Sequence, residues 1–232
     1  MTTTEQPSNT VTDVDEGSAT PVLAEGAPPE HSGHAEHPSA HPTATGVTSP
    51  KLAIWIFLAS DCLFFGAFIA AYLLYRGHPN QKGPGPREVF NIPFTSITSF
   101  ILLMSSLTMV LALAALQRGD LRRTRIWLMA TALFGATFIG GQVFEFTEFA
   151  RHGLHLDSNL FGSTFFVLTG FHGAHVSAGI IWLLSLWGLC MQGRLTQKDA
   201  QRLEIAGLYW HFVDIVWIVI FTVIYLVPQP GK

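Results

Sequence analysis

The chain has 232 residues, of which 49% are hydrophobic and only 12% are charged, against about 25% charged residues in an ordinary soluble domain. The formal net charge is −3. Because seven of the acidic residues precede Lys51, this net charge gives no indication of a partner, whether nucleic acid or another class of molecule. This composition excludes an ordinary soluble domain and predicts a membrane protein with several spans. Cys62 and Cys190 both lie in apolar segments and are expected to be small buried side chains rather than a disulfide pair.

Residues 1–50 form a separate polar region that contains no Lys or Arg. The region is rich in Thr, Ser, Pro, Ala, Glu and Gly, and such a composition buries too little apolar surface to offset the entropy of ordering. We therefore expect a disordered, cytoplasmic tail. Its histidines have a spacing that metal ligands can adopt, but nothing in the sequence fixes the imidazoles around an ion, which favours a low-complexity tail. These histidines are His31, His34, His37 and His41.

The remainder, residues 51–228, is expected to be a single helical membrane domain. It contains five apolar segments, each long enough for the ~20 helical residues that cross a bilayer. The expected helices cover residues 52–75, 94–117, 126–149, 160–190 and 205–227. The sequence thus predicts an all-α bundle of five transmembrane helices, and the odd number of helices argues against a transporter built from paired repeats.

Basic residues in the loops predict the orientation of the chain. With five crossings, the N-terminus and the second and fourth loops share one side of the membrane, and that side carries eight basic residues against five on the other. The excess is concentrated in the two short loops, which matter most for the positive-inside rule. We expect the N-terminus in the cytoplasm and the C-terminus outside.

The fourth segment has the most informative pattern, because no charged residue occurs between Asp157 and Arg194. Small residues recur along it and predict a seam at which another helix approaches closely in lipid. The seam consists of Gly170, Gly173, Ala174 and Ala178. His172 and His175 lie one turn apart in the same span, and ionisable groups inside a membrane usually face the interior of a bundle.

Asp61 lies about 14 Å along the first helix, near the middle of the bilayer. An isolated carboxylate at that depth takes up a proton or finds a hydrogen-bond donor. Two interpretations stay open: a proton-active or lipid-linked acid, and a structural hydrogen bond within the bundle.

The other polar residues inside the spans are predicted to form a buried network that joins helices. It comprises Gln142, Glu145, His172, His175, His211 and Asp214. A His–carboxylate pair would offset the cost of burial, whereas an HxxH pair could bind a metal. We favour hydrogen bonding, since the three protein ligands and the supporting contacts of a catalytic metal are not evident. The aromatic residues around Asp214 on the last helix are expected to be packing.

Four motifs carry a resemblance to a known family. They are IWIFLASDCLFFGAFIAAYLLYR, GGQVFEFTEF, GSTFFVLTGFHGAHVSAG and YWHFVDIVWIVIFTVIYL, which occur in this order between residues 52 and 228. In these stretches the chain resembles subunit III of the haem–copper respiratory oxidases, in its short bacterial form with five helices rather than seven.

The resemblance implies a subunit without catalytic residues, haem, copper or other metal of its own. Haem and copper are then in partner subunits: the chain packs directly on subunit I, beside subunit II and others, in the bacterial cytoplasmic membrane. It would bind structural phospholipid and support proton uptake by a complex that reduces dioxygen and pumps protons. The intramembrane acid of the family corresponds to Asp61 in this sequence. The YWHFVDIVW motif resembles that of cytochrome c oxidases more than that of quinol oxidases.

Alternative functions remain open at this point. The chain could be subunit III of a quinol oxidase or an accessory subunit of a nitric oxide reductase. An independent proton-coupled transporter that uses Asp61 and Asp214 is an alternative of a different class.

Overall fold

A computed structural model describes residues 49–75, 92–151 and 160–227. In these ranges the chain forms five long helices: α1 (Ser49–Tyr75), α3 (Ile92–Gln117), α4 (Leu121–Arg151), α5 (Leu160–Met191) and α6 (Ala200–Phe221). A 3₁₀ turn (Gln197–Asp199) precedes α6, and a π-helical turn (Thr222–Leu226) extends it. Five segments of the described chain are long and apolar enough to cross a membrane, which confirms the predicted all-α membrane bundle.

Several predictions lie outside the described residues. The predicted disorder of the N-terminal tail and the role of its histidines belong there, as do the loops around residues 76–91 and 152–159. The predicted domain boundary at residues 50 and 51 is not tested, although α1 begins at Ser49.

The second loop is shorter than expected, because α4 begins at Leu121 rather than near residue 126. Gly119, with φ of 78°, ends α3, and Asp120 N donates to the Ala115 carbonyl at 3.0 Å. Asp120 then caps α4, where its Oδ1 accepts from Arg123 N at 3.0 Å. The arginines therefore occupy the first turns of a helix, where hydropathy alone does not predict one.

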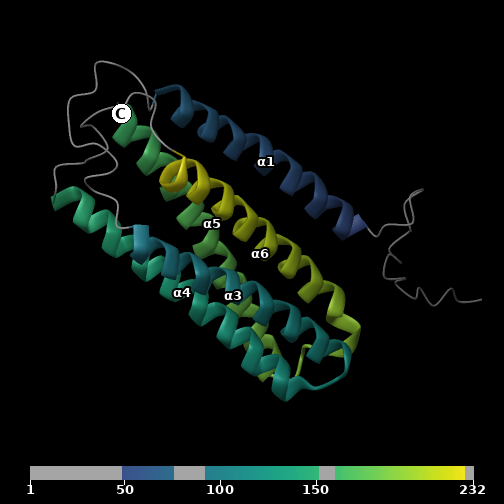
Figure 1. Ribbon diagram of the computed structural model, residues 1–232. Helices are drawn as coiled ribbons and strands as arrows, with labels where there is room; N and C mark the ends of the chain where they lie inside the picture. Colours follow the sequence, from purple (N-terminus) through teal and green to yellow (C-terminus); the bar gives the residue numbers. More distant parts are fainter. Residues whose placement is uncertain (1–48, 76–91, 152–159, 228–232) are drawn as a thin grey trace, which may run out of the picture. The chain divides into compact units, whose positions relative to one another are not determined.

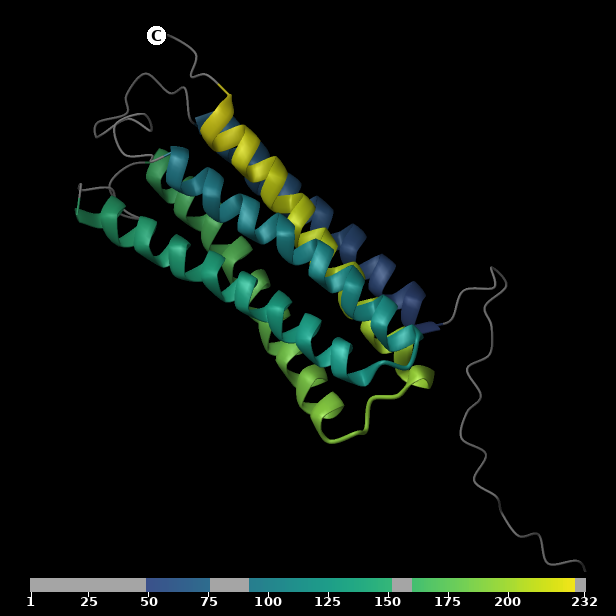
Figure 2. The ribbon, with the colours of Figure 1, turned by 60° about the horizontal axis from the view of Figure 1, so that its bottom comes forward.

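Four of the helices pack in a ring, and the fifth lies beside it (Figure 1). Helix α3 packs along α4, α4 along α5, and α6 contacts both α3 and α5. Helix α1 contacts α5 and α6, and the turned view also shows it alongside α6 (Figure 2). Most of α1 is not covered by the described chain: Leu63 is 78% exposed and Leu74 is 71% exposed. Such faces suit lipid or a partner subunit.

Trp210 occupies the centre of the ring. Its side chain is 1% exposed, and its indole Nε1 donates to Ser105 Oγ on α3 at 2.8 Å. The edge of the indole fits against two glycines. A Cβ atom at Gly135 on α4 would lie 2.6 Å from Trp210 Cη2, and a Cβ atom at Gly179 on α5 would lie 2.8 Å from Trp210 Cζ3. One aromatic side chain of α6 thus contacts α3, α4 and α5, and the two glycines leave the space that it fills.

Candidate functional site

Asp61 on α1 lies opposite His175 on α5. Asp61 Oδ2 is 3.4 Å from His175 Nε2, and the side chains are 14% and 20% exposed, respectively. The other ring nitrogen, Nδ1, is 2.8 Å from the Phe171 carbonyl, which only accepts, so Nδ1 carries hydrogen. A neutral imidazole has one N–H. A hydrogen bond between His175 and Asp61 therefore needs a second proton, either on Nε2 or on the carboxyl group.

Aromatic rings surround this pair. Phe65 contacts the His175 ring edge-on at 5.1 Å, and Phe64 and Phe68 contact Phe171 at 5.4 and 5.3 Å between ring centres. Phe64, Phe65 and Phe68 follow Asp61 by three, four and seven residues, so they lie on its face of α1. The pair thus lies between two helices in a largely apolar setting, where a charge interaction would be stronger than in water.

His172, one turn before His175, has a different partner. Its side chain is fully buried and Nε2 donates to the Val213 carbonyl on α6 at 3.2 Å. Its ring lies 4.8 Å from that of Trp217. Because His172 faces α6 whereas His175 faces α1, the HxxH spacing does not bring both rings to one ion. The described part of the chain contains no cluster of three metal-ligating side chains.

His211 and Asp214 meet through a serine from another helix. Ser106 Oγ on α3 lies 2.8 Å from His211 Nδ1 and also donates to Asp214 Oδ2. Asp214 is 3% exposed, and within the described residues its Oδ1 has no hydrogen-bond partner.

The remaining predicted polar residues join α4 to its neighbours. Gln142 Nε2 donates to the Thr169 carbonyl on α5 at 2.7 Å. The Glu145 carboxyl group accepts from Thr95 on α3 and from Tyr225 in the π-helical turn. Both side chains are 7% exposed, so each is a polar contact between buried helix faces.

The predicted small-residue seam does not lie on a single interface. Gly173 faces Gln142, whose Oε1 would lie 2.7 Å from an added Cβ. Gly170 has no atom within 4 Å of that position, and Ala174 and Ala178 are exposed. Part of the seam therefore packs within the chain, and part faces outward from the described bundle.

The sequence interpretation missed the hydroxyl groups of α3 that complete these contacts. They belong to Thr95, Ser99, Ser105 and Ser106, which bind Glu145, Trp217, Trp210 and the His211–Asp214 pair, respectively. Their recurrence at near-helical spacing on an uncharged helix is the signal that could have revealed them.

The comparisons with known proteins agree with this architecture. The family described as "Cytochrome c oxidase subunit III" matches residues 35–228. Cytochrome c oxidase subunit 3 of Bacillus sp. (strain PS3) is 36% identical over 78% of this chain and 86% of its own length. Quinol oxidase subunit 3 of Bacillus subtilis is 36% identical over 85% of this chain and 98% of its own. Cytochrome bo(3) ubiquinol oxidase subunit 3 of Pseudomonas aeruginosa is 37% identical over 84% and 90%.

These relatives include both cytochrome c and quinol oxidase subunits, so the similarity does not identify the electron donor. Family, helix number and apolar spans agree on a membrane-embedded subunit of a terminal oxidase. The chain belongs to the cytochrome c oxidase subunit III family.

Proposed function

We propose that this chain is the non-catalytic subunit III of a proton-pumping cytochrome c oxidase in a bacterial cytoplasmic membrane. It packs on subunit I beside subunit II, binds phospholipid, and keeps proton uptake fast while haem and copper in the partner subunits reduce dioxygen. The observation that carries the proposal is the division of its side chains: the acids and imidazoles of the spans make their contacts between helices, whereas the outer faces are apolar.

The two kinds of outer face suit two kinds of neighbour. The open seam of Gly170, Ala174 and Ala178 on α5 allows close approach of a helix from subunit I. The exposed side of α1, with Phe64 40% and Leu63 78% exposed, suits the acyl chains of phospholipid. In this arrangement the Asp61–His175 pair holds the lipid-bearing α1 against α5.

Orientation is proposed from the arginines. Three arginines lie where α3 connects to α4: Arg118, Arg122 and Arg123. Arg194 lies in the connection from α5 to α6, and Arg202 lies in the first turn of α6. Such a basic end favours the cytoplasmic side. The N-terminus is then cytoplasmic and the C-terminus outside.

The donor is tested on the purified complex. A complex that contains haem and oxidises reduced cytochrome c supports the proposal, whereas one that oxidises quinol and not cytochrome c assigns the chain to a quinol oxidase. A nitric oxide reductase would be recognised by nitric oxide consumption, and an independent transporter by a colourless lone protein.

Asp61→Asn tests the role of the intramembrane acid. The variant removes the carboxyl group that lies 3.4 Å from His175 Nε2, so α1 and its lipid are held less firmly. A partly exposed pair is worth about 1 kcal/mol, which corresponds to about fivefold faster inactivation during turnover. Turnover-dependent inactivation, bound phospholipid and pumped protons are measured together.

Glu204→Gln is the matched control, because it removes a second ion pair of α1, Lys51 Nζ to Glu204 Oε1 at 2.7 Å. We expect it to leave the inactivation rate within about twofold of the parent complex, since the side chains of this pair are 31% and 39% exposed. If Asp61→Asn leaves lipid content, inactivation and pumping unchanged, the acid has no functional role.

A further inference from the structure

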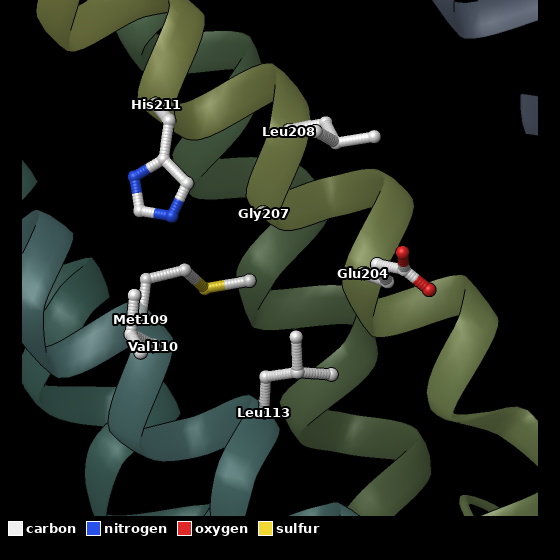
Figure 3. Close-up of a pocket in the computed structure, with 7 residues that line it drawn as sticks. All are labelled: Met109, Val110, Leu113, Glu204, Gly207, Leu208 and His211. Atoms are coloured by element: carbon white, nitrogen blue, oxygen red, sulfur yellow. The ribbon is translucent and has the colours of Figure 1, made fainter.

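A hollow of about 110 Å³ lies between α3 and α6 (Figure 3). Met109 and Leu113 from α3 and Gly207 from α6 form apolar parts of its wall, and Glu204 and His211 are the ionisable side chains among the described residues that line it. Glu204 lies one turn from the start of α6 at Ala200. His211 lies two turns further along, about 10 Å at 1.5 Å per residue. The hollow thus extends from near the end of the bundle to an imidazole inside it.

Beyond His211 a chain of hydrogen bonds continues into the bundle. Ser106 Oγ has one hydrogen, which it donates to Asp214 Oδ2, so toward His211 it accepts. The Nδ1 of His211, 2.8 Å away, is therefore the donor. His211 Nδ1–H thus donates to Ser106 Oγ, and the Ser106 hydroxyl group donates to Asp214 Oδ2. Nε2 of His211 takes no part in these two bonds and is available to the hollow that His211 lines.

We propose that His211, Ser106 and Asp214 form a proton relay, in which His211 takes up protons from the hollow and Asp214 stores one. That the complex uses the stored proton rests on the function proposed above. The existence of the relay does not, because it follows from the contacts of this chain alone.

The transfer conserves the number of protons, and only N–H and O–H bonds break and form. A proton arrives on Nε2 of His211 and leaves the ring from Nδ1, where an N–H bond breaks as an O–H bond forms on Ser106. Ser106 in turn releases its original proton to Asp214 Oδ2. The products are a neutral carboxylic acid and a neutral imidazole with hydrogen on Nε2, and the reverse sequence returns the proton to the hollow.

The surroundings of Asp214 suit a store rather than a fixed ion. A buried carboxylate oxygen without a donor is costly, and Asp214 Oδ1 has none among the described residues. On the neighbouring helices, Lys51 of α1 pairs with Glu204, Asp61 of α1 lies beside His175, and Nε2 of His172 on α5 donates to the Val213 carbonyl, so none of these three contacts is made to Asp214. Helix α3 has no charged residue between Ile92 and Gln117.

The relay is tested by infrared spectroscopy of the purified complex that contains the full chain. The difference between parent and Asp214→Asn spectra is expected to contain the C=O stretch of a neutral carboxyl group. On transfer to D₂O this band shifts as the acid exchanges its proton. In Ser106→Ala the shift is expected to be about 10²-fold slower, since positioned proton-transfer groups contribute factors of that order.

Ser105→Ala is the matched control. It also removes a hydrogen bond between α3 and α6, the bond from Trp210 Nε1 to Ser105 Oγ. Because this bond involves no titratable group, carboxyl exchange is expected at the parent rate. His211→Asn supplies a second test that keeps an amide donor for Ser106 while removing titration, and it is expected to slow exchange as Ser106→Ala does.

Two outcomes overturn the relay: absence of a carboxyl band that Asp214→Asn removes, and equal exchange rates in the Ser105→Ala and Ser106→Ala complexes. Haem content and donor oxidation, measured on the same samples, report separately on the proposed function. A complex without oxidase activity that retains the band and its slowed exchange would refute that function and leave the relay intact.

Discussion

Gly135→Ala and Gly179→Ala are each expected to destabilise the chain by about 1–3 kcal/mol, the usual cost of overpacking a filled core. Both methyl groups would meet the Trp210 ring, at 2.6 and 2.8 Å. The ring has little room to move, since its Nε1 is bound to Ser105 and its side chain is 1% exposed. Thermal unfolding of the purified chain in detergent, followed by near-ultraviolet circular dichroism, measures the effect.

Gly140→Ala is the control on the same helix, because a Cβ atom there meets nothing within 4 Å. Alanine is the better helix former by about 1 kcal/mol, so this change is expected to leave stability equal or slightly higher. The two positions on α4 should therefore respond with opposite sign. Equal responses at Gly135 and Gly140 would show that Trp210 does not fill the space between α4 and α5.

The membrane helices themselves were predictable, because twenty apolar residues in lipid have few structures other than a helix. The start of α4 was not, since hydropathy penalises the arginines that follow Asp120. Local chemistry there outweighs it: Gly119 ends one helix with a positive φ and Asp120 caps the next. Reading caps as well as hydropathy would have moved the boundary.

That Asp61, His172 and Asp214 face protein rather than lipid follows from the cost of a polar group in hydrocarbon. Their individual partners do not follow, because these depend on how each helix is rotated about its axis. His172 and His175 are one turn apart yet bind α6 and α1, respectively. From the sequence, Asp214 could have contacted an imidazole directly. In the structure, Ser106 of α3 lies between Asp214 and His211.

The small-residue seam illustrates the same limit. Glycine and alanine occur on more than one side of α5, and their positions alone do not say which side faces another helix of the same chain. The packed side is occupied by Gln142 against Gly173 and by Trp210 against Gly179. A large residue on a neighbouring helix, rather than the small ones, identifies an internal interface.

Removal of the Thr95 hydroxyl group is expected to cost about 1–3 kcal/mol of stability, because it leaves a buried acid with one donor fewer. Thr95 is fully buried, and Glu145 is 7% exposed between α3, α4 and the π-helical turn. Thr95→Val keeps the side-chain shape while it removes the donor to Glu145. Thermal unfolding in detergent again provides the measurement. Thr147→Val provides the control, because Thr147 is exposed and its hydroxyl group donates to the Val143 carbonyl of its own helix.

A double-mutant cycle separates this hydrogen bond from the packing of the threonine. In a Glu145→Leu background the carboxyl group is gone, so Thr95→Val should cost much less than in the parent chain, and the difference is the coupling between the two side chains. Equal costs in both backgrounds would contradict the contact. A large coupling would mean that Glu145 acts mainly to join α3, α4 and the C-terminal turn, since Tyr225 binds the same carboxyl group from that turn.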